Sequence, residues 1–468
     1  LLEVTKQFGV GLITAGNFLT NDETGAALPG DAYARMKLLF DATRVTGGFP
    51  ADVALTAGDA ASTVFTTLAP GDLIHNYQQV GWDAFQSVSG TGQTLATETV
   101  DGSSYAAALA TQTGGRNVLF STPGVMADNN LLWQAIDYAA KPAGIQLSLD
   151  LTRFKGIVAS RTDMDQSMYR EDVSPEDGGP GIYDKLLPIL AEWKQDYNFV
   201  GSYYVNIGND PADGQTTDWS VSAPYYAQLL AMGNELGTHS YTHPEDTNIL
   251  TPEQLEFEFE QSKLVLEQQM SAYLGTPFTV AGAAVPGAVE TLDTSQQIIQ
   301  YFDYITGGFS GVGAGYPGAF GFLSPDLTNA VYLSPDTSFD FTLLEYQHLD
   351  PAAAAAAWDQ EWNQLVANAN TPIVLWPWHD YGAAAWPTDP PNPSPYATSL
   401  FTDWIARAYN SGAEFVTEAD LAARIQSFYH SGVTSTINGN TIDVTVTSSH
   451  AGDFPLNLSG LGSEVIAS

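Results

Sequence analysis

The chain has 468 residues, of which 44% are hydrophobic, 12% aromatic and only 15% charged, a composition that indicates packed globular domains and excludes a disordered chain. Its 53 acidic and 15 basic side chains give a net charge of −38, which excludes nucleic acid and anionic membranes as partners because binding either needs a clustered basic face. No apolar run is long enough to span a membrane, and with no cysteine a metal site can use only His, Asp, Glu and backbone oxygen.

The first residues, "LLEVTKQF", contain no initiator Met and no charged start followed by an apolar core. This is expected of a mature or trimmed product. Heavy acidity with few lysines fits a secreted protein from a salty or open environment, although cytoplasmic proteins of halophiles have a similar composition. We therefore expect a secreted or periplasmic location.

Residues 1–150 alternate short apolar runs with helix-like stretches. This alternation is typical of a parallel sheet covered by helices, so we predict a doubly wound α/β accessory domain, flavodoxin-like or Rossmann-like. The domain lacks the spacing of either glycine-rich phosphate fingerprint and has no nucleophilic cysteine. Strands are predicted at 9–16, 51–59, 116–124 and 145–152, and helices at 31–45 and 129–141.

From 151 to 428 the same alternation continues with longer loops, which predicts a second α/β domain. Helices are expected at 181–197 and 251–275, and strands at 198–208 and 371–382, the last running into an aromatic loop. After Tyr429 the pattern changes. Asn438-Gly439 between two alternating runs is a strong hairpin signal, so residues 429–468 are predicted to form a β-rich C-terminal segment.

Two histidines lie four positions apart in "GTHSYTHPED", at His239 and His243. They can be metal ligands or two satisfied polar residues in a loop. A zinc protease motif is excluded, because it needs a glutamate directly after the first histidine and Ser240 stands there. Pro244 would end any helix, so the pair is expected at a strand end or loop, where both imidazoles can still reach one ion.

A third ligand would be a carboxylate, giving the two-histidine, one-acid set of a catalytic zinc. In "SRTDMDQS", Asp163 and Asp165 would point to one face of an extended segment, because side chains alternate with period two. One could bind metal while the other acts as a base. The alternative is a pair that caps a turn or a helix.

A third histidine, His379, follows a predicted strand in "WPWHDYG". A lone histidine in an aromatic loop is usually a packed residue, yet catalytic groups gather at strand ends in α/β barrels. Asp380 or another carboxylate could keep its imidazole protonated for use as an acid.

These stretches, in this order, resemble the polysaccharide deacetylase superfamily of carbohydrate esterases, which includes chitin and peptidoglycan deacetylases. "GNELGTHSYTHPE" is similar to its His-(Ser/Thr)-x-x-His metal motif, and "SGAEFVTEADL" to its closing strand and helix. The separated pair Asp163-Met164-Asp165 is closest to exopolysaccharide deacetylases of the Pel type. The resemblance covers residues 151 to about 428 and implies a distorted (β/α)7 barrel there.

The chain departs from that family at two motifs. Where the family has Arg-x-Pro, this chain has Ala284 and Pro286, so the arginine that orients the catalytic aspartate in the family is missing. Where the family has Leu-x-His, Pro377 stands two before His379, and Leu375, Trp376 or Trp378 would form the pocket for the acetyl methyl group. The stretch 305–311 is the expected place of the family's pocket tryptophan.

The resemblance implies metal-dependent removal of N-acetyl groups from an amino-sugar polysaccharide, an exopolysaccharide or a chitin-like polymer. Asp165, His239 and His243 would hold the divalent ion, zinc first, with cobalt or nickel as alternatives. Asp163 would be the base and His379 the acid. The residues expected to contact substrate, with aromatic rings stacking on sugars, are Trp376, Trp378, Asp380, Tyr381 and Pro286; Trp386 is a further stacking candidate.

Two other functions compete with this hypothesis. A carbohydrate-binding protein could keep the barrel and the ion without catalysis, and the alanine at position 284 favours it. Asp163 and His379 count against it, because binding alone needs neither a base nor an acid. A glycoside hydrolase would need carboxylates flanking a sugar bond, and Asp163 and Asp165 are too close together in the sequence for that.

Overall fold

The computed structural model divides the chain into two compact units. Unit 1 is Leu1–Gln146 with the short segments Val366–Ala369 and Ser459–Ser468, and unit 2 is Leu147–Leu365 with Asn370–Leu458. None of the described helices is long and apolar enough to cross a membrane. The structure describes residues 6–22, 24–127, 130–140, 146–308, 310–312, 331–367, 369, 371–388, 392–439, 441–449 and 455–459.

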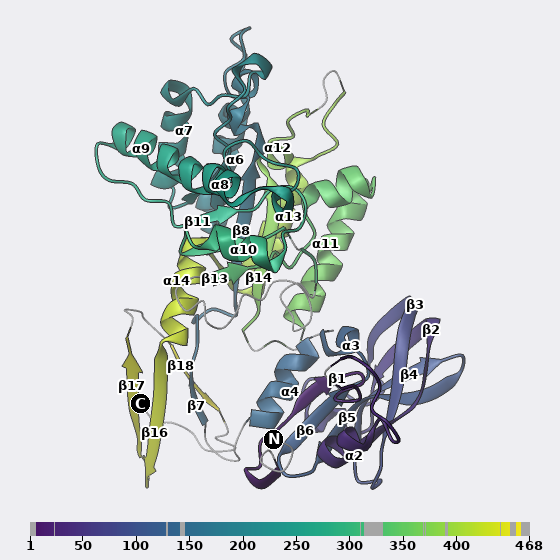
Figure 1. Cartoon of the computed structure of the whole chain (residues 1–468). Helices are drawn as coiled ribbons and strands as arrows, with labels where there is room; N and C mark the ends of the chain where they lie inside the picture. The colour runs from purple at the N-terminus through teal and green to yellow at the C-terminus, as the bar shows by residue number, and fades with distance from the viewer. Residues whose placement is uncertain are drawn as a thin grey trace. The chain divides into compact units, whose positions relative to one another are not determined.

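Unit 1 is built on a six-stranded sheet of order β1-β6-β5-β3-β2-β4 (Figure 1). Among the described residues, the only parallel pair is β1 with β6, and the remaining pairs are antiparallel. The strands are β1 (Ile13–Ala15), β2 (Ala42–Ala57), β3 (Leu73–Ser87), β4 (Gln93–Val100), β5 (Ser103–Gln112) and β6 (Arg116–Phe120), and the helices α2 (Ala34–Phe40), α3 (Pro123–Ala127) and α4 (Leu131–Ala140).

The prediction of a doubly wound domain over residues 1–150 is therefore wrong. The helix expected at 31–45 ends at Phe40, because Asp41 takes a left-handed conformation (φ 53°) and β2 begins at Ala42. Asp101 and Gly102 join β4 to β5 at positive φ (48° and 75°). A two-residue Asp-Gly loop is a hairpin signal, so these two residues in the sequence already contradict a parallel sheet.

Unit 2 is a curled sheet of eight strands with helices packed around it (Figure 1). Within this eight-stranded sheet, every strand pair among the described residues is parallel. The strands, in the order of the sheet, are β13 (Val331–Leu333), β12 (Tyr304–Thr306), β11 (Gly282–Ala284), β10 (Glu235–Thr238), β9 (Ser202–Val205), β8 (Gly156–Met164) and β14 (Ile373–His379), with β15 (Ala413–Val416) also paired to β8.

The parallel, barrel-like sheet predicted for unit 2 is confirmed in this coarse form. The predicted (β/α)7 layout of the barrel is not confirmed. Strand β8 has three partners, with β14 on one side and both β15 and β9 on the other. Asp336 links the two ends of the sheet: its N–H donates to the Leu375 carbonyl (3.0 Å) and its carboxylate accepts from the Leu375 N–H (2.8 Å). Strand ends from distant parts of the chain thereby meet at one rim.

The helices of unit 2 follow from caps and apolar faces in the sequence. The stretch 251–275 is helical as predicted, and its first turn is a capping box in which Thr251 and Gln254 bond each other's backbone N–H. The helices are α5 (Arg170–Val173), α6 (Ile182–Tyr197), α7 (Trp219–Ala231), α8 (Pro252–Leu255), α9 (Ser262–Leu274), α10 (Leu292–Ile299), α11 (Pro351–Val366), α12 (Asp380–Ala383), α13 (Thr398–Ser411) and α14 (Glu418–Tyr429).

Strand β8 pairs with β14, β9 and β15 and is buried along its whole length. Its side chains alternate between two faces. Ile157 and Ala159 join the cluster enclosed by the curled sheet, together with Tyr204. Arg161 and Asp163 continue this inner face at the carboxyl end of the strand, where the candidate site lies.

The C-terminal segment contains the predicted hairpin. Strands β16 (Ser431–Asn438) and β17 (Thr441–Ser448) pair along their full length around Asn438-Gly439. A second small sheet joins β18 (Leu456–Ser459) to β7 (Gln146–Leu149). Neither sheet contributes a residue to the site described below.

Candidate metal centre

His239 and His243 come from the loop that follows β10. His239 is the first residue after the strand and is 1% exposed. The chain then turns back through Ser240, with a φ of 81°, and the Ser240 hydroxyl accepts a hydrogen bond from the His243 N–H (2.9 Å). The two imidazole centroids are 5.0 Å apart as a result, so a tight turn, and not a helix, brings the pair together.

The carboxylate of Glu258 fixes this loop from outside. Its oxygens accept hydrogen bonds from the N–H of Tyr241 (3.0 Å), the N–H of Thr242 (2.8 Å) and the Thr242 hydroxyl (2.6 Å). Glu258 lies in the π-helical turn Glu256–Gln261 and is 6% exposed. Three hydrogen bonds to one buried carboxylate therefore hold the loop in its turned conformation.

The protonation of His239 is set by the neighbouring strand. Its Nδ1 is 3.0 Å from the Ala284 carbonyl oxygen, which can only accept, so Nδ1 carries the proton and Nε2 keeps its lone pair. Burial lowers the pKa of His239 to about 4 despite the nearby charge of Asp163. The imidazole is thus neutral and presents Nε2, as a metal ligand must.

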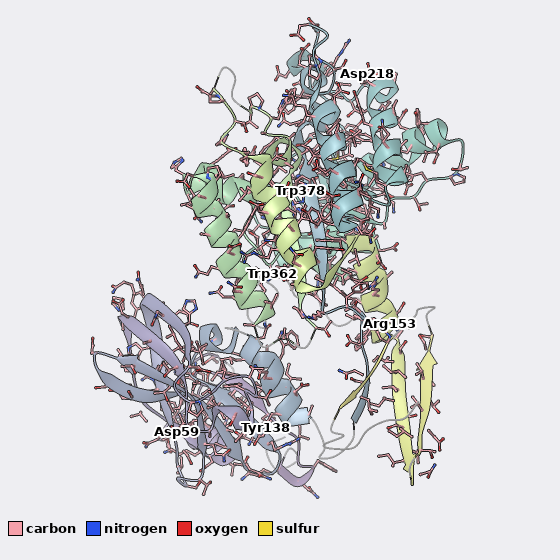
Figure 2. The ribbon with its side chains drawn as sticks, turned by 180° about the vertical axis from the view of Figure 1, so that it is seen from behind. Asp59, Tyr138, Arg153, Asp218, Trp362 and Trp378 are labelled. Carbon is pink, nitrogen blue, oxygen red and sulfur yellow. The ribbon has the colours of Figure 1, made fainter. Side chains whose placement is uncertain are left out.

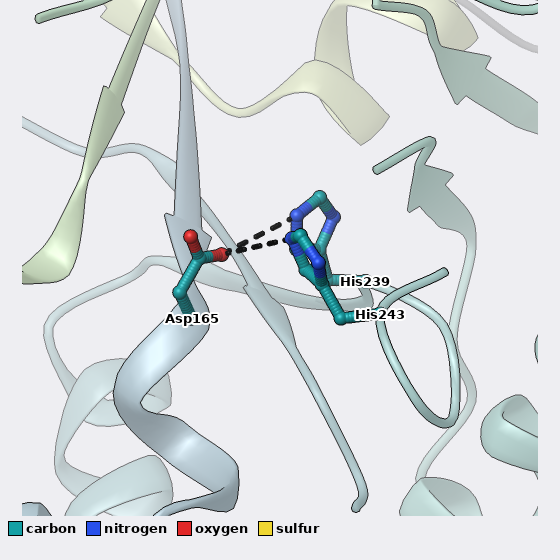
Figure 3. A group of neighbouring side chains, drawn as sticks. All are labelled: Asp165, His239 and His243. Atoms are coloured by element: carbon teal, nitrogen blue, oxygen red, sulfur yellow. Dashed lines mark ion pairs between the residues drawn. The ribbon is translucent and has the colours of Figure 1, made fainter. Parts of the chain in front are cut away.

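Asp165 completes a group of three (Figure 3). Its Oδ1 is 3.5 Å from His239 Nε2 and 3.6 Å from His243 Nε2, and the three ligand atoms lie within 4.8 Å of one another. Oδ1 is buried and has no hydrogen-bond partner among the described residues, which is costly for a carboxylate unless a cation satisfies it. The residues therefore fit a divalent ion held by two histidines and one acid, the donor set of catalytic zinc sites.

Asp163 adjoins this group from strand β8. It is 2% exposed, and its Oδ2 is 3.5 Å from His239 Nε2. Arg161 donates hydrogen bonds to both carboxylate oxygens of Asp163, from Nε to Oδ1 (2.8 Å) and from Nη2 to Oδ2 (2.7 Å). Burial raises the pKa of Asp163, but the charge of Arg161 more than offsets this and lowers it to about 2. Asp163 is consequently ionised at any working pH.

His379 adjoins the group from strand β14, with its Nε2 3.8 Å from Asp165 Oδ2. Its Nδ1 is 2.6 Å from Asp340 Oδ1, and its backbone N–H donates to Asp340 Oδ2 (3.1 Å). Burial lowers the pKa of His379, but the charge and hydrogen bond of Asp340 raise it to about 10. The imidazole is held protonated, as a general acid requires.

Asp380 is not the partner of His379. Its carboxyl group is fully buried and accepts hydrogen bonds from the Tyr183 hydroxyl (3.1 Å) and the Tyr381 N–H (2.8 Å). The role belongs to Asp340, which lies 39 positions from His379 and was missed by sequence reasoning. Tyr381 stacks on the imidazole with centroids 4.8 Å apart.

The expectation that Trp376 and Trp378 present exposed faces to a sugar is wrong, because both are fully buried. Alternation along β14 turns His379 to the inner face and these two indoles to the helices. Trp376 stacks on Trp404 of α13 (4.1 Å), and Trp378 packs against Trp193 of α6 (5.9 Å). Figure 2 shows Trp378 within this layer of helices.

The other residues expected at the site are also largely covered. Pro286 is buried, Tyr381 is 7% exposed and Trp386 is 9% exposed. Substrate contact by Pro286, Asp380 and Tyr381 stays a prediction. In the stretch 305–311, Phe309 lies outside the described residues.

No family model matches the chain, and no curated protein matches it significantly. Part of the chain is similar to several solved structures. A chitin deacetylase from the fungal pathogen Colletotrichum lindemuthianum shares 16% identity at a TM-score of 0.33, covering 57% of this chain and 88% of that one. A family 4 acetyl xylan esterase from Clostridium thermocellum, in complex with cobalt, shares 17% at 0.31, covering 57% and 89%.

A CE4 family pseudoenzyme from Bacillus anthracis shares 11% identity at a TM-score of 0.33, covering 59% of this chain and 68% of that one. These likenesses are too distant to indicate a function, and one of the similar structures is a pseudoenzyme. The function has to follow from the geometry of the site itself.

Proposed function

We propose that the chain is a metal-dependent N-deacetylase that removes acetyl groups from an amino-sugar polysaccharide. One observation supports this above the others. Two titratable side chains adjoin the Asp165, His239 and His243 group, and their own ion-pair partners push their pKa values in opposite directions, Asp163 to about 2 and His379 to about 10. An ionised carboxylate and a protonated imidazole beside one cluster form a base and acid pair.

The residues divide the work of amide hydrolysis. Asp165, His239 and His243 would hold a divalent ion, which when bound would act as a Lewis acid, lowering the pKa of a water from about 15.7 toward about 7 and polarising the amide carbonyl. Asp163 accepts the proton of the attacking water. His379 donates its proton to the leaving amine nitrogen, and Asp340 stabilises the imidazolium until then.

A binding protein would not need this arrangement. Asp163 is 2% exposed and His379 is 5% exposed, and burying charged groups is expensive unless they are paired. Each has a dedicated partner of opposite charge, Arg161 and Asp340. Carbohydrate binding uses neither a buried base nor a buried acid, so this arrangement favours catalysis.

A polymeric sugar substrate is proposed because an exposed aromatic ring lies near His379. Tyr346 is 76% exposed and ends the π-helical turn Thr342–Tyr346, which begins two residues after Asp340. Its ring contacts Phe341 (5.4 Å), which in turn contacts His379 (5.2 Å). Tyr346 therefore replaces Trp376 and Trp378 as the ring that would stack on a neighbouring sugar.

The net charge of −38 would attract the polymer as deacetylation makes it cationic, most strongly at low salt. The substrate would then be an exopolysaccharide or a chitin-like chain. A secreted or periplasmic location, where such polymers accumulate, is part of this proposal.

The test is release of acetate from partially acetylated amino-sugar oligomers by the full chain, before and after metal removal and return of zinc. We expect zinc-dependent release that is lost in His239→Ala and falls at least a hundredfold in Asp163→Asn. His348→Ala, an exposed histidine outside the site, should behave as wild type. Stoichiometric binding of zinc without acetate release from any oligomer would favour the carbohydrate-binding protein.

A further inference from the structure

Arg161 is a buried cation at the edge of the candidate site, on the same strand as Asp163. It is 2% exposed. Because side chains two positions apart on a strand share a face, its guanidinium group reaches the Asp163 carboxylate directly. The two groups form a pair of nearly parallel hydrogen bonds, 2.8 and 2.7 Å long, the geometry in which arginine fixes both the position and the plane of a carboxylate.

All five N–H donors of the guanidinium group have an acceptor. Nε and one Nη2 hydrogen bind Asp163, and the second Nη2 hydrogen binds the Val285 carbonyl (2.9 Å). Nη1 donates to the carbonyls of Thr306 (3.2 Å) and Gly307 (2.6 Å). An arginine has five such donors, so none is left to move or to bind solvent.

The three carbonyls belong to the backbone at the ends of β11 and β12. Arg161 thus ties Asp163 to two other strands of the sheet, while the Phe339 ring lies 5.1 Å from the guanidinium carbon. Oδ2 of Asp163 remains directed toward His239 at 3.5 Å. Backbone atoms held in a sheet move little. Because Arg161 binds both these atoms and Asp163, the position of the Asp163 carboxylate is fixed as well.

Stability alone does not account for this pair. A buried ion pair is often no more stabilising than apolar side chains of the same volume, because both charges lose their hydration. Strand β8 is apolar at its inner positions Ile157 and Ala159 and changes to charged residues at 161 and 163. Buried charges therefore occur on this face of β8 only at its carboxyl end, beside the Asp165, His239 and His243 group.

The neighbouring strand leaves room for this arrangement. At position 284, the alanine side chain is fully buried among Tyr204 and Tyr304. The next residue, Val285, offers its carbonyl to Arg161. No long side chain enters from β11, so the guanidinium group on β8 occupies the space beside Asp163.

We propose that Arg161 is the positioning residue of the base: from the base's own strand, it fixes the plane of the Asp163 carboxylate toward the metal cluster. This inference rests on the proposed deacetylase function. It means that the alanine at position 284 does not mark the chain as inactive, because the orienting cation is supplied from another strand.

The test compares Arg161→Met, Arg161→Lys and Arg161→Ala with the wild-type full chain, measuring zinc binding, kcat and KM on acetylated amino-sugar oligomers. We expect zinc stoichiometry and KM to stay within a few fold, because Arg161 touches neither the ligand atoms nor the substrate. We expect kcat to fall about a hundredfold or more in Arg161→Met, as for loss of an oriented catalytic group. Arg161→Lys should lose at least tenfold, because lysine cannot hold two oxygens in one plane.

Chemical rescue separates positioning from folding. Guanidinium ion added to Arg161→Ala should restore part of kcat, whereas ethylammonium, a point charge without a fork, should not. Arg161→Lys keeps a buried cation opposite Asp163 and so serves as the folded variant if the others unfold. Arg44→Met, which breaks the partly exposed ion pair with Asp83 in unit 1, is the matched control and should keep wild-type kcat.

The outcomes are distinct. An active wild type together with an Arg161→Met or Arg161→Lys variant of unchanged kcat would overturn the positioning role and leave the deacetylase proposal standing. A variant that loses zinc and kcat together would make Arg161 a residue of the metal site's structure, which also overturns the inference. A wild type inactive on every acetylated oligomer would remove the reaction itself, and both proposals with it.

Discussion

Asp340 holds His379 at two points, through the imidazole and through the backbone. Its Oδ1 is 2.6 Å from Nδ1, and its Oδ2 accepts the His379 N–H at 3.1 Å. Asp340 is fully buried, so its charge acts at close range in a medium of low polarity. This single carboxylate fixes the orientation of the ring and stabilises its charged form.

Replacing Asp340 with Asn should therefore shift the pH dependence of the reaction. The pKa of His379 is raised to about 10, so the imidazole is protonated below that pH and loses its proton as the pH rises through it. Without the charge of Asp340, burial dominates and the pKa falls. We expect kcat of Asp340→Asn to be lost at a lower pH than in the wild type, with a deficit of at least tenfold at pH 8 that shrinks toward pH 6.

The measurement is the pH profile of kcat together with NMR titration of the labelled imidazole. Asp196→Asn, an exposed aspartate on α6, should leave both unchanged. If Asp340→Asn kept the wild-type alkaline limit, His379 would not be the acid that Asp340 supports.

Glu258 should control the affinity for the metal without touching it. Glu258→Gln removes the negative charge that accepts from the Tyr241 and Thr242 N–H groups, so the loop bearing His239 and His243 should lose its fixed conformation. Outer residues that orient metal ligands typically contribute 10-fold to 100-fold in affinity. We expect zinc affinity, measured by calorimetry against a competing chelator, to fall within about that range. Glu256→Gln, exposed in the same helical turn, should bind zinc normally.

Tyr346 should affect long substrates and spare short ones. Tyr346→Ala removes the exposed ring that is joined through Phe341 to His379, and stacking of a nucleic-acid base on an aromatic side chain, taken here as a guide, is worth about 1–3 kcal/mol. We expect KM for a tetramer or longer oligomer to rise about tenfold, with kcat and the KM of a single acetylated sugar nearly unchanged. Tyr273→Ala, which removes an exposed tyrosine on α9, is the control. If Tyr346→Ala and Tyr273→Ala had equal KM values for long oligomers, Tyr346 would not contact the substrate.

The sequence predicted those parts of the site that are local. His239 and His243 are four positions apart and Asp163 and Asp165 only two, so short-range spacing marked each pair as a candidate, and the resemblance to the deacetylase superfamily joined the two pairs. The same alternation places Arg161 on the face of Asp163, so the sequence also contains the signal for this pair. Asp340 lies 39 positions from His379, and only the closure of the sheet through Asp336 and β14 brings the two together. No local pattern contains that information.

The sequence also predicts one part of the fold correctly and another wrongly. Alternating strands and helices correctly predicted a parallel sheet in unit 2, where the neighbouring strands of the sheet run parallel. In unit 1 the same reading failed, because Asp101-Gly102 turns the chain directly back and makes β4 and β5 antiparallel. The burial of the tryptophans of β14 does not follow from the sequence, because a strand buried on both faces gives no alternation of polarity.

Glu98 allows a prediction about unit 1 that does not depend on the site. It lies on β4 and is 1% exposed, and its Oε1 has no hydrogen-bond partner among the described residues. Burial, and then the charge of Asp83, raise the pKa of Glu98 to about 8. Because the folded state holds the proton more tightly than the unfolded state, this group favours folding fully below its ordinary pKa of 4.5, and that contribution is lost as the pH rises through about 8.

We therefore expect the free energy of opening of β4 and β5 to fall between pH 5 and pH 8 in the wild type. Glu98→Gln has no proton to lose and should show a much flatter dependence. Amide hydrogen exchange, corrected for the intrinsic rate at each pH, measures this opening within unit 1 directly. Asp59→Asn, an exposed carboxylate in the same unit, should follow the wild type. A wild-type slope that persists in Glu98→Gln would assign the pH dependence to another group.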